Sequence, residues 1–353
     1  MIEARIRKAL PGAAALDLEF RVSEGLTVLY GPNGAGKTPT LNAIAGFVKP
    51  DEGRILLGDQ IVFDSGSRIH VPARARRCGY LPPADALFPH MTLRENLVFS
   101  AACRRLPRLE RHRKVSEIIE RFHLSEAAGR RPREISESER LRGSVARAVV
   151  GQPRVLLADD PARGLDLALR VEAGRLLRQV QAEFGIPVVL ATQDLDQCFD
   201  LAEEMLVLRG GRLLQQAAPR EIFDQPSSVE VARLLGVYNL LPAEIKALDP
   251  ARNVSRLRLE QMELAGPYFP GRMRGDQVTV CMRPDELLAR PAGGKPGPNQ
   301  LAVQLVRTAE RPSAVRLEFT GGILADVPRS EYEQRKHLRE WVVEFPADRL
   351  RVL

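Results

Sequence analysis

The stretch that decides the fold is Gly31-Pro32-Asn33-Gly34-Ala35-Gly36-Lys37-Thr38, which matches the phosphate-binding loop (P-loop) pattern GxxxxGK(S/T) at every fixed position. The apolar segment 26–30 runs directly into the first glycine, and residues 38–47 after the loop are typical of a helix. In a strand–loop–helix unit, glycines let backbone N–H groups turn toward phosphate oxygens, and the helix N-terminus adds the positive end of its dipole. The sequence therefore predicts that residues 31–38 bind the phosphates of a nucleotide, which a glycine-rich turn without a ligand would not require.

The end of this loop and a second strand supply the residue types for ATP and Mg²⁺ chemistry. Lys37 is expected to reach the β- and γ-phosphates of ATP, and the Thr38 hydroxyl is expected to bind Mg²⁺. The apolar strand 155–158 ends in two acids, Asp159 and Asp160. With the loop present, Asp159 is predicted to hold the Mg²⁺ water shell, and Asp160 to orient the attacking water as a catalytic residue. We therefore expect ATP and Mg²⁺ to be the ligands of this chain.

Pro39, directly after the loop, has no backbone N–H to offer to the α-phosphate. Proline is sterically acceptable in the first turn of a helix, so the fold is expected to tolerate it. The loss of one charge-assisted hydrogen bond is expected to weaken nucleotide binding by about 1.5–3 kcal/mol.

The organisation of the chain changes twice along its length. The first half alternates strands and helices, the pattern of an α/β domain with a largely parallel sheet. Residues 92–132 are helical and basic, which predicts a helical subdomain inserted into this core, and the short strands after Gly236 predict a small all-β barrel. The expected domains are 1–236, with the helical subdomain at 92–148, and 237–353. The expected strands are 26–30, 54–57, 61–63, 155–158, 188–191, 206–208, 212–214, 255–259, 278–280, 315–319 and 341–343.

The composition limits the class of protein. Of 353 residues, 44% are hydrophobic and 27% are charged, a balance that excludes a wholly disordered chain. No apolar run approaches the roughly 18–20 residues that cross a bilayer, and the N-terminus lacks the apolar core of a secretion signal. We therefore expect the chain to stay in the cytoplasm. The cysteines, which form no CxxC pair and favour reduced thiols over a zinc site, are Cys78, Cys103, Cys198 and Cys281.

The formal net charge of +7 is concentrated in basic clusters. Three explanations stay open: contact with nucleic acid, proximity to an anionic membrane face, or a solvated helical face. Nucleic acid is disfavoured, because no aromatic residues lie between the basic ones to stack on bases. The clusters are Arg104, Arg105, Arg108, Arg111, Arg113 and Lys114, followed by Arg130, Arg131 and Arg133.

The order of motifs along residues 31–241 resembles that of an ABC-transporter ATPase, and more narrowly that of the molybdate/sulfate importer subfamily. Any one of these motifs alone would be weak evidence for the family, whereas their shared order makes the fold assignment specific. The resemblance implies a P-loop ABC ATPase fold of the α/β class with an inserted helical subdomain. The segments that carry it are Gly79-Tyr80 and Asp85 to Leu97 (the Q-loop region), Ile135 to Ala148 (the signature helix), Gly164 to Asp166 (the D-loop), Leu190 to Asp196 (the H-loop), and 219–223 with 238–242.

The resemblance also assigns residues and partners. It implies that Ser136 and Asp166 contact the nucleotide and that Gln193 stands at the catalytic switch position. After residue 241 it implies a TOBE-type, OB-like barrel. The partners it implies are integral-membrane permease subunits, a second ATP-binding subunit that is a copy or a relative, and, indirectly, a periplasmic oxyanion-binding protein. The chain would lie peripherally on the cytoplasmic face of the inner membrane. Candidate oxyanion contacts in the barrel are Thr279, Arg283 and Ser313.

Four residues depart from the family pattern at positions that take part in ATP binding or hydrolysis in the family. Pro83 replaces the Q-loop glutamine, Glu137 replaces a signature glycine, Asp160 replaces the catalytic glutamate, and Gln193 replaces the switch histidine. Two unit charges about 4 Å apart repel by roughly 4 kcal/mol at an effective dielectric near 20, so the Glu137 carboxylate would oppose a γ-phosphate. Asp160 is one methylene shorter, and a misplacement of about 1 Å can cost on the order of 10²-fold in rate. No aromatic residue lies between positions 10 and 16, where many family members stack one on adenine.

Two functions follow from these observations. The first is an ATP-binding subunit of an importer for molybdate or a related oxyanion, which dimerises on ATP and drives transport by hydrolysis. The alternative is a pseudo-ATPase that holds ATP and regulates or completes a transporter assembly without useful turnover. A free-standing nucleic-acid-associated ABC protein is not expected, because it would normally carry two ATPase cassettes and this chain has one P-loop.

Overall fold

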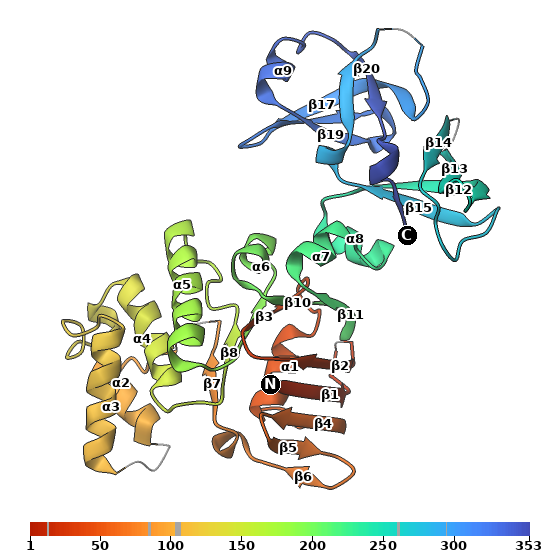
Figure 1. Cartoon of the computed structure of the whole chain (residues 1–353). Helices are drawn as coiled ribbons and strands as arrows, with labels where there is room; N and C mark the ends of the chain where they lie inside the picture. Colours follow the sequence, from red (N-terminus) through yellow and green to blue (C-terminus); the bar gives the residue numbers. More distant parts are fainter. Residues whose placement is uncertain (13, 84–85, 103–106, 260–261, 294) are drawn as a thin grey trace. The chain divides into compact units, whose positions relative to one another are not determined.

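The computed structural model describes residues 1–12, 14–83, 86–102, 107–259, 262–293 and 295–353, which form two compact units (Figure 1). Unit 1 is Met1–Gln225 and unit 2 is Pro226–Leu353. The division precedes helix α8 (Val229–Leu235), which contacts strand β15 (Gln277–Met282) of unit 2, whereas the boundary expected from the sequence followed this helix. The residues used in the sequence argument that lie outside the described ranges are Asp85, Cys103, Arg104 and Arg105.

Unit 1 is built on an eleven-stranded sheet with the order β6-β5-β4-β1-β2-β11-β10-β3-β9-β8-β7. Adjacent strands in the series β10, β3, β9, β8 and β7 pair in parallel, whereas adjacent strands in the series β6, β5, β4, β1 and β2 pair antiparallel. The prediction of a largely parallel sheet is therefore wrong for half of the sheet. The sequence did hold a signal for the antiparallel half, because residues 16–22 alternate between apolar and charged side chains, as in a strand with one solvated face. The strands are β1 (Ile2–Lys8), β2 (Leu16–Val22), β3 (Leu26–Tyr30), β4 (Glu52–Leu57), β5 (Gln60–Asp64), β6 (Ile69–His70), β7 (Cys78–Leu81), β8 (Val155–Asp159), β9 (Val188–Thr192), β10 (Glu204–Arg209) and β11 (Arg212–Ala217).

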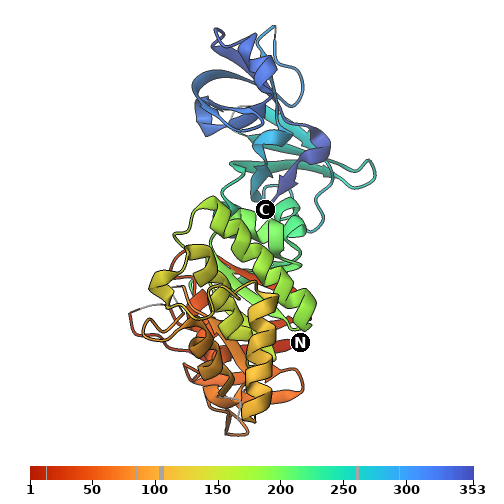
Figure 2. The same cartoon turned by 90° about the vertical axis from the view of Figure 1, so that its left-hand side faces the viewer.

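The helices of unit 1 include the predicted inserted subdomain, which is confirmed. Helices α2, α3 and α4 follow β7 and precede β8 in the chain, and they group beside the β7 edge of the sheet (Figures 1 and 2). Helix α5 buries residues at helical spacing, among them Ala173, Leu177 and Val180, against β9, α4 and α6. In the described part of the chain, no helix is both long enough and apolar enough to span a membrane. The helices are α1 (Lys37–Ala45), α2 (Leu93–Ala102), α3 (Arg108–Arg121), α4 (Glu137–Val149), α5 (Leu167–Phe184), α6 (Leu195–Leu201) and α7 (Pro219–Asp224), with short 3-10 turns at Ala73–Ala75 and Pro132–Glu134.

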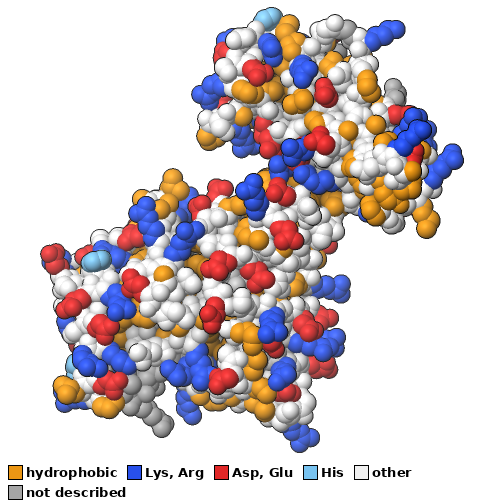
Figure 3. Space-filling view, viewed as in Figure 1, with side chains coloured by type: hydrophobic (Ala, Val, Ile, Leu, Met, Phe, Trp, Pro, Cys, Tyr) orange, Lys and Arg blue, Asp and Glu red, His pale blue; other side chains and the backbone are white. Residues whose placement is uncertain are grey.

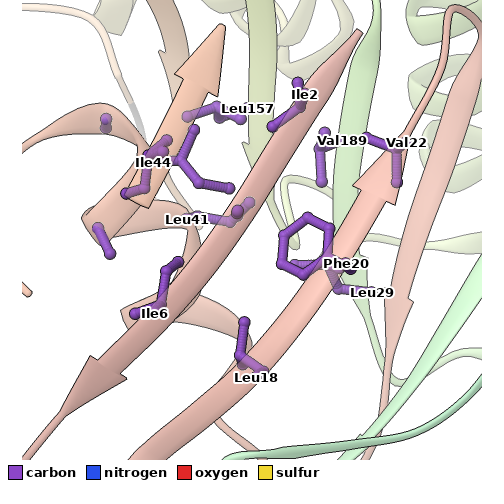
Figure 4. Close-up of a cluster of buried hydrophobic side chains, with 14 of the residues drawn as sticks. Ile2, Ile6, Leu18, Phe20, Val22, Leu29, Leu41, Ile44, Leu157 and Val189 are labelled. Atoms are coloured by element: carbon purple, nitrogen blue, oxygen red, sulfur yellow. The ribbon is translucent and has the colours of Figure 1, made fainter. Parts of the chain in front are cut away.

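The hydrophobic core of unit 1 joins α1 to the sheet. Leu41 and Ile44 of α1 are fully buried and lie in one cluster with side chains from β1, β2, β3, β8 and β9 (Figure 4). Burying a side chain of this size stabilises the fold by about 1.5–3 kcal/mol. Because α1 begins at the end of the P-loop, the packing that holds this helix also fixes the position of the loop.

Unit 2 is dominated by antiparallel strands. It contains two five-stranded sheets, with the orders β14-β13-β12-β15-β21 and β16-β20-β17-β18-β19. Buried side chains from both sheets, such as Leu257, Val280 and Trp341, form one hydrophobic core. The all-β prediction is confirmed, but in the described part of unit 2 the strands form two sheets instead of a single closed barrel. The remaining elements are β12 (Asn239–Asp249), β13 (Val254–Leu259), β14 (Met262–Gly266), β16 (Leu288–Pro291), β17 (Gln300–Glu310), β18 (Val315–Phe319), β19 (Leu324–Val327), α9 (Arg329–Glu333), β20 (Glu340–Glu344) and β21 (Arg351–Val352), with 3-10 turns at Pro284–Glu286, Thr320–Gly322 and Ala347–Arg349.

The basic segment of the helical subdomain carries acids among its bases. On α3, Lys114 pairs with Glu110 at 3.2 Å and Arg121 pairs with Glu117 at 3.0 Å. Figure 3 shows side chains of both signs interspersed over the face of unit 1 that it presents. This mixture is typical of a solvated helical face, the third of the explanations considered for the positive charge.

Candidate nucleotide-binding site

The P-loop connects β3 to α1, and close packing explains two of its glycines. A Cβ added to Gly31 would lie 2.2 Å from the carbonyl oxygen of Leu208 on β10. Gly36 has a φ of 104°, a left-handed conformation that other residues rarely adopt, and a Cβ there would lie 2.8 Å from Leu16 Cδ2 on β2. The glycines therefore let the loop approach its neighbouring strands, in addition to freeing backbone N–H groups for a ligand.

Lys37 closes the loop from inside. Its Nζ donates hydrogen bonds to the carbonyl oxygens of Gly31 at 2.6 Å and Pro32 at 3.0 Å. Burial lowers the pKa of the Lys37 ammonium, and the nearby carboxylates of Asp160 and Asp159 act in the opposite direction. An ammonium has three N–H donors, so this arrangement leaves one donor for a phosphate oxygen.

Thr38 and Asp159 form the predicted pair of metal-binding groups. The Thr38 hydroxyl donates to Asp159 Oδ1 at 2.9 Å, and Asp159, the last residue of β8, is only 3% exposed. The hydroxyl of Tyr80 lies 3.2 Å from the other carboxylate oxygen, Oδ2. No group of three or more His, Cys, Asp or Glu that could hold a metal occurs in the described ranges. Two oxygen donors without a complete protein cage fit Mg²⁺, which is usually held by one or two protein groups together with phosphates and water.

Asp160 and Gln193 lie at the same edge of the sheet as the P-loop. The parallel strands β3, β9 and β8 are neighbours, and Asp159 is paired with Ala191, two residues before the exposed Gln193. Carboxyl ends of parallel strands are where α/β sheets bind ligands. The structure therefore places residues 31–38, Asp159, Asp160 and Gln193 at one edge of the sheet.

Asp160 lies in a turn that also contains a cationic residue, Arg163. Its φ is 49°, its N–H donates to the carbonyl oxygen of Ala191 at 2.9 Å, and its own carbonyl accepts from the N–H of Arg163 at 3.0 Å. Burial raises the pKa of Asp160, whereas the positive charges of Arg163 and Lys37 act against that rise. Sequence reasoning missed Arg163, although an arginine three residues after a catalytic-type acid was visible as a charge signal.

Ser136 and Asp166 cap helices instead of facing the P-loop. The Ser136 Oγ accepts from the N–H of Glu139 at 3.2 Å, and the Glu139 carboxylate accepts from the N–H of Ser136 at 2.8 Å and from its hydroxyl at 2.7 Å. This capping box at the start of α4 was readable as the S-x-x-E pattern and was missed. Asp166 accepts from the N–H of Leu169 at 2.9 Å at the start of α5. Among the described residues, neither side chain hydrogen-bonds to the P-loop.

Two of the four departures from the family pattern, Pro83 and Glu137, line one cavity of 250 Å³. Glu137 there forms an ion pair with Arg140 at 3.3 Å and has a side chain 63% exposed. The cavity thus joins the segment after β7, the start of α4 and the turn after β8. Its walls include Pro82, Pro83, Glu137, Arg140, Pro161 and Arg163.

Comparison with known proteins agrees with this geometry. The sequence profile of the ABC transporter family matches residues 16–163. The spermidine/putrescine import ATP-binding protein PotA of Vibrio cholerae is 36% identical over 273 residues, which are 77% of this chain and 70% of that protein. The trehalose/maltose import ATP-binding protein MalK of Thermococcus litoralis is 34% identical over 78% of this chain and 74% of its own. The chain belongs to the ABC transporter family of ATP-binding subunits.

Solved ABC structures show the same fold. CbiO1 of Clostridium perfringens, part of the ABC transporter complex cbiONQ, has a TM-score of 0.56 and 25% identity, covering 67% of this chain and 94% of that one. The ATP-binding cassette MJ0796, solved with ADP and phosphate, has a TM-score of 0.52 over 62% of this chain and 99% of its own.

The narrower subfamily prediction is not supported. The ABC relatives named above are described as polyamine and sugar importers, and neither is described as a molybdate or sulfate importer. The family profile ends within unit 1, so it gives no support for a TOBE-type assignment of unit 2.

Proposed function

We propose that this chain is the ATP-binding subunit of an ABC importer and binds Mg²⁺-ATP at residues 31–38. The observation that carries the proposal is the intact P-loop, with the partly buried Lys37 bonded to its carbonyl oxygens and the Thr38 hydroxyl 2.9 Å from Asp159. Backbone N–H groups of the loop would hold the phosphates, with the remaining Lys37 donor on the terminal phosphate. Thr38 and Asp159 would hold Mg²⁺, which supplies charge compensation at the β- and γ-phosphates.

In this proposal the hydrolytic groups are Asp160 and Gln193. The Asp160 carboxylate accepts a hydrogen bond from the attacking water, and burial, by raising its pKa, makes it a better proton acceptor. The positive charges of Arg163 and Lys37 oppose this rise in pKa and favour the ionised carboxylate. Gln193 can donate to a γ-phosphate oxygen but stays neutral. Because Asp160 is one methylene shorter than a glutamate, turnover should be slow by up to about 10²-fold.

We further propose that the partners are those of an importer. A second ATP-binding subunit would place Ser136 and Asp166 across the interface from the nucleotide, and permease subunits would dock on the helical subdomain at the cytoplasmic face of the membrane. The names of the relatives support a polyamine as cargo before a sugar, and give no support to an oxyanion. Uptake of labelled spermidine, maltose and molybdate by cells with and without this chain tests the choice. Loss of molybdate uptake alone would contradict it.

One observation favours a second function, a nucleotide-binding regulator with little turnover. At the start of α4, the Glu139 carboxylate accepts hydrogen bonds from the N–H and the hydroxyl of Ser136, and Glu137 adds another negative charge. In the family, this helix start faces the γ-phosphate bound by the other subunit. Two carboxylates in the first turn oppose that contact, because like charges repel where an anion should bind.

Phosphate release by the purified chain, alone and with its permease, separates the two functions. An importer ATPase should turn over when its permease is present, whereas a regulator should bind ATP and stay slow in both conditions. The variant that combines Glu137→Gly, Ser138→Gly, Asp160→Glu and Gln193→His should then gain far more than any single change, because groups that act together are not additive. A wild-type rate already at about 1 s⁻¹ or above would exclude the regulator.

A further inference from the structure

The hydroxyl of Tyr80 connects two elements of the nucleotide site. Tyr80 lies on β7, and its hydroxyl oxygen is 2.9 Å from Asn42 Oδ1 on α1 and 3.2 Å from Asp159 Oδ2 on β8. A phenol has one proton and donates to one oxygen at a time. Both contacts are satisfied together when the Asn42 amide presents its NH₂ to the phenol oxygen and the phenol donates to Asp159. A chain of hydrogen bonds then runs from α1 through Tyr80 to the carboxylate.

Asp159 depends on these bonds because it is buried. Only 3% of the residue is exposed, and a buried carboxylate is costly unless its oxygens accept hydrogen bonds. Oδ1 accepts from Thr38 at 2.9 Å and Oδ2 accepts from Tyr80. With one donor on each oxygen, the plane of the carboxylate is fixed. Without Tyr80, the Asp159 carboxylate would keep only one hydrogen bond, to Thr38, and its plane could rotate.

The Tyr80 ring is itself held in place and stays a donor. Phe47 packs edge-on against it, with ring centroids 5.1 Å apart and planes at 69°. Both rings line a cavity of 410 Å³ together with Pro82 and Arg147. A phenol carries its proton at neutral pH, so the hydroxyl is available as a donor to Asp159.

We propose that Tyr80 is a positioning residue that orients Asp159 for the metal ion of Mg²⁺-ATP. The proposal rests on the proposed function, since it concerns the metal-binding carboxylate of that site. This role is not implied by the place of Tyr80 in the Q-loop region. Because Tyr80 and Phe47 both line the 410 Å³ cavity, the Asp159 carboxylate is connected to the wall of that cavity.

The test uses Mn²⁺ in place of Mg²⁺ and the whole chain. Free Mn²⁺ is followed by electron paramagnetic resonance during titration in the presence of ATP, and ATP binding without metal is measured in EDTA. Tyr80→Phe keeps the ring against Phe47 and removes only the hydroxyl, so Mn²⁺ affinity should fall about tenfold while metal-free ATP binding stays unchanged. Tyr268→Phe in unit 2 is the matched control and should change neither quantity.

A second variant guards against a folding defect. Asn42→Ala leaves the phenol in place but removes the group that orients it, so Mn²⁺ affinity should fall by a smaller factor in the same direction. Unchanged Mn²⁺ affinity in Tyr80→Phe, or in Asn42→Ala if the first variant does not fold, would overturn the role of Tyr80. Absence of metal-dependent ATP binding by the wild-type chain would instead overturn the proposed function.

Discussion

Replacing Glu137 by glycine should weaken the fold and speed ATP turnover at the same time. Glu137 is the first residue of α4, its side chain is 63% exposed, and it pairs with Arg140 at 3.3 Å. An exposed pair of this kind contributes about 0.3–0.5 kcal/mol, an acid at a helix N-terminus about 0.3–1 kcal/mol, and glycine costs up to about 1 kcal/mol. The free energy of unfolding should therefore fall by about 1–2 kcal/mol, which lowers the melting temperature by about 2–8 °C in a unit of this size.

The effect of Glu137→Gly on turnover should have the opposite sign. A carboxylate about 4 Å from a phosphate charge costs roughly 4 kcal/mol at an effective dielectric of 20, and Arg140 and solvent screen part of it. If one third of that repulsion acts in the transition state, its removal raises the rate about tenfold. The assay is phosphate release at saturating Mg²⁺-ATP, with thermal melts on the same samples.

Two controls make this prediction refutable. Glu117→Gly on α3 breaks a comparable pair, with Arg121 at 3.0 Å, and should lower stability without raising the rate. Glu137→Gln removes the charge without adding glycine, so it should reproduce most of the rate gain. A folded, ATP-binding Glu137→Gly variant with unchanged turnover would show that this carboxylate does not oppose the phosphate.

The other predictions concern charge at three further places. Arg163→Gln should raise the pKa of Asp160 further, because Arg163 opposes the rise caused by burial, and the acid limb of the pH profile of phosphate release should move to higher pH; an unmoved limb would contradict the pairing. Glu95 has a pKa lowered first by the backbone N–H bond at the start of α2, so its stabilisation is present above its unfolded pKa near 4.3 and is lost as pH falls through the lower folded value. Urea unfolding of Glu95→Gln should thus differ from wild type near pH 6, and the difference should shrink steadily as the solution is made acidic. Arg351→Met should destabilise unit 2 by about 1.5–3 kcal/mol, because it removes the 2.6 Å partner of Glu286, whose side chain is 5% exposed and keeps Arg283 at 3.3 Å; a calorimetric melt with an unshifted unit 2 transition would refute this.

The sequence predicted the parts of the site that are local in the chain. The P-loop and the Asp159-Asp160 pair each follow a short apolar strand, so pattern and chemistry coincide within a few residues. All eleven strands expected from short apolar runs are present within the observed elements. The mixed character of the unit 1 sheet could also have been found from the alternation in residues 16–22.

The contacts missed by sequence reasoning depend on tertiary structure. Tyr80 reaches Asp159 across 79 positions of the chain, and no local pattern encodes that approach. The cavity that gathers Pro83, Glu137 and Arg163 exists only because three separate segments meet. By contrast, the S-x-x-E pattern that starts at Ser136 predicts a capping role, whereas the resemblance to a signature motif implies a contact with the nucleotide.

Calorimetric titration of the wild-type chain and of Lys37→Ala with Mg²⁺-ATP determines whether this chain binds the nucleotide through its P-loop. Lys37 donates to Gly31 and Pro32 at 2.6 and 3.0 Å and is the cation inside the loop. We expect saturable binding of one ATP per wild-type chain and no measurable binding by a folded Lys37→Ala variant. Equal affinity in the two proteins, or no binding by the wild type, would contradict it.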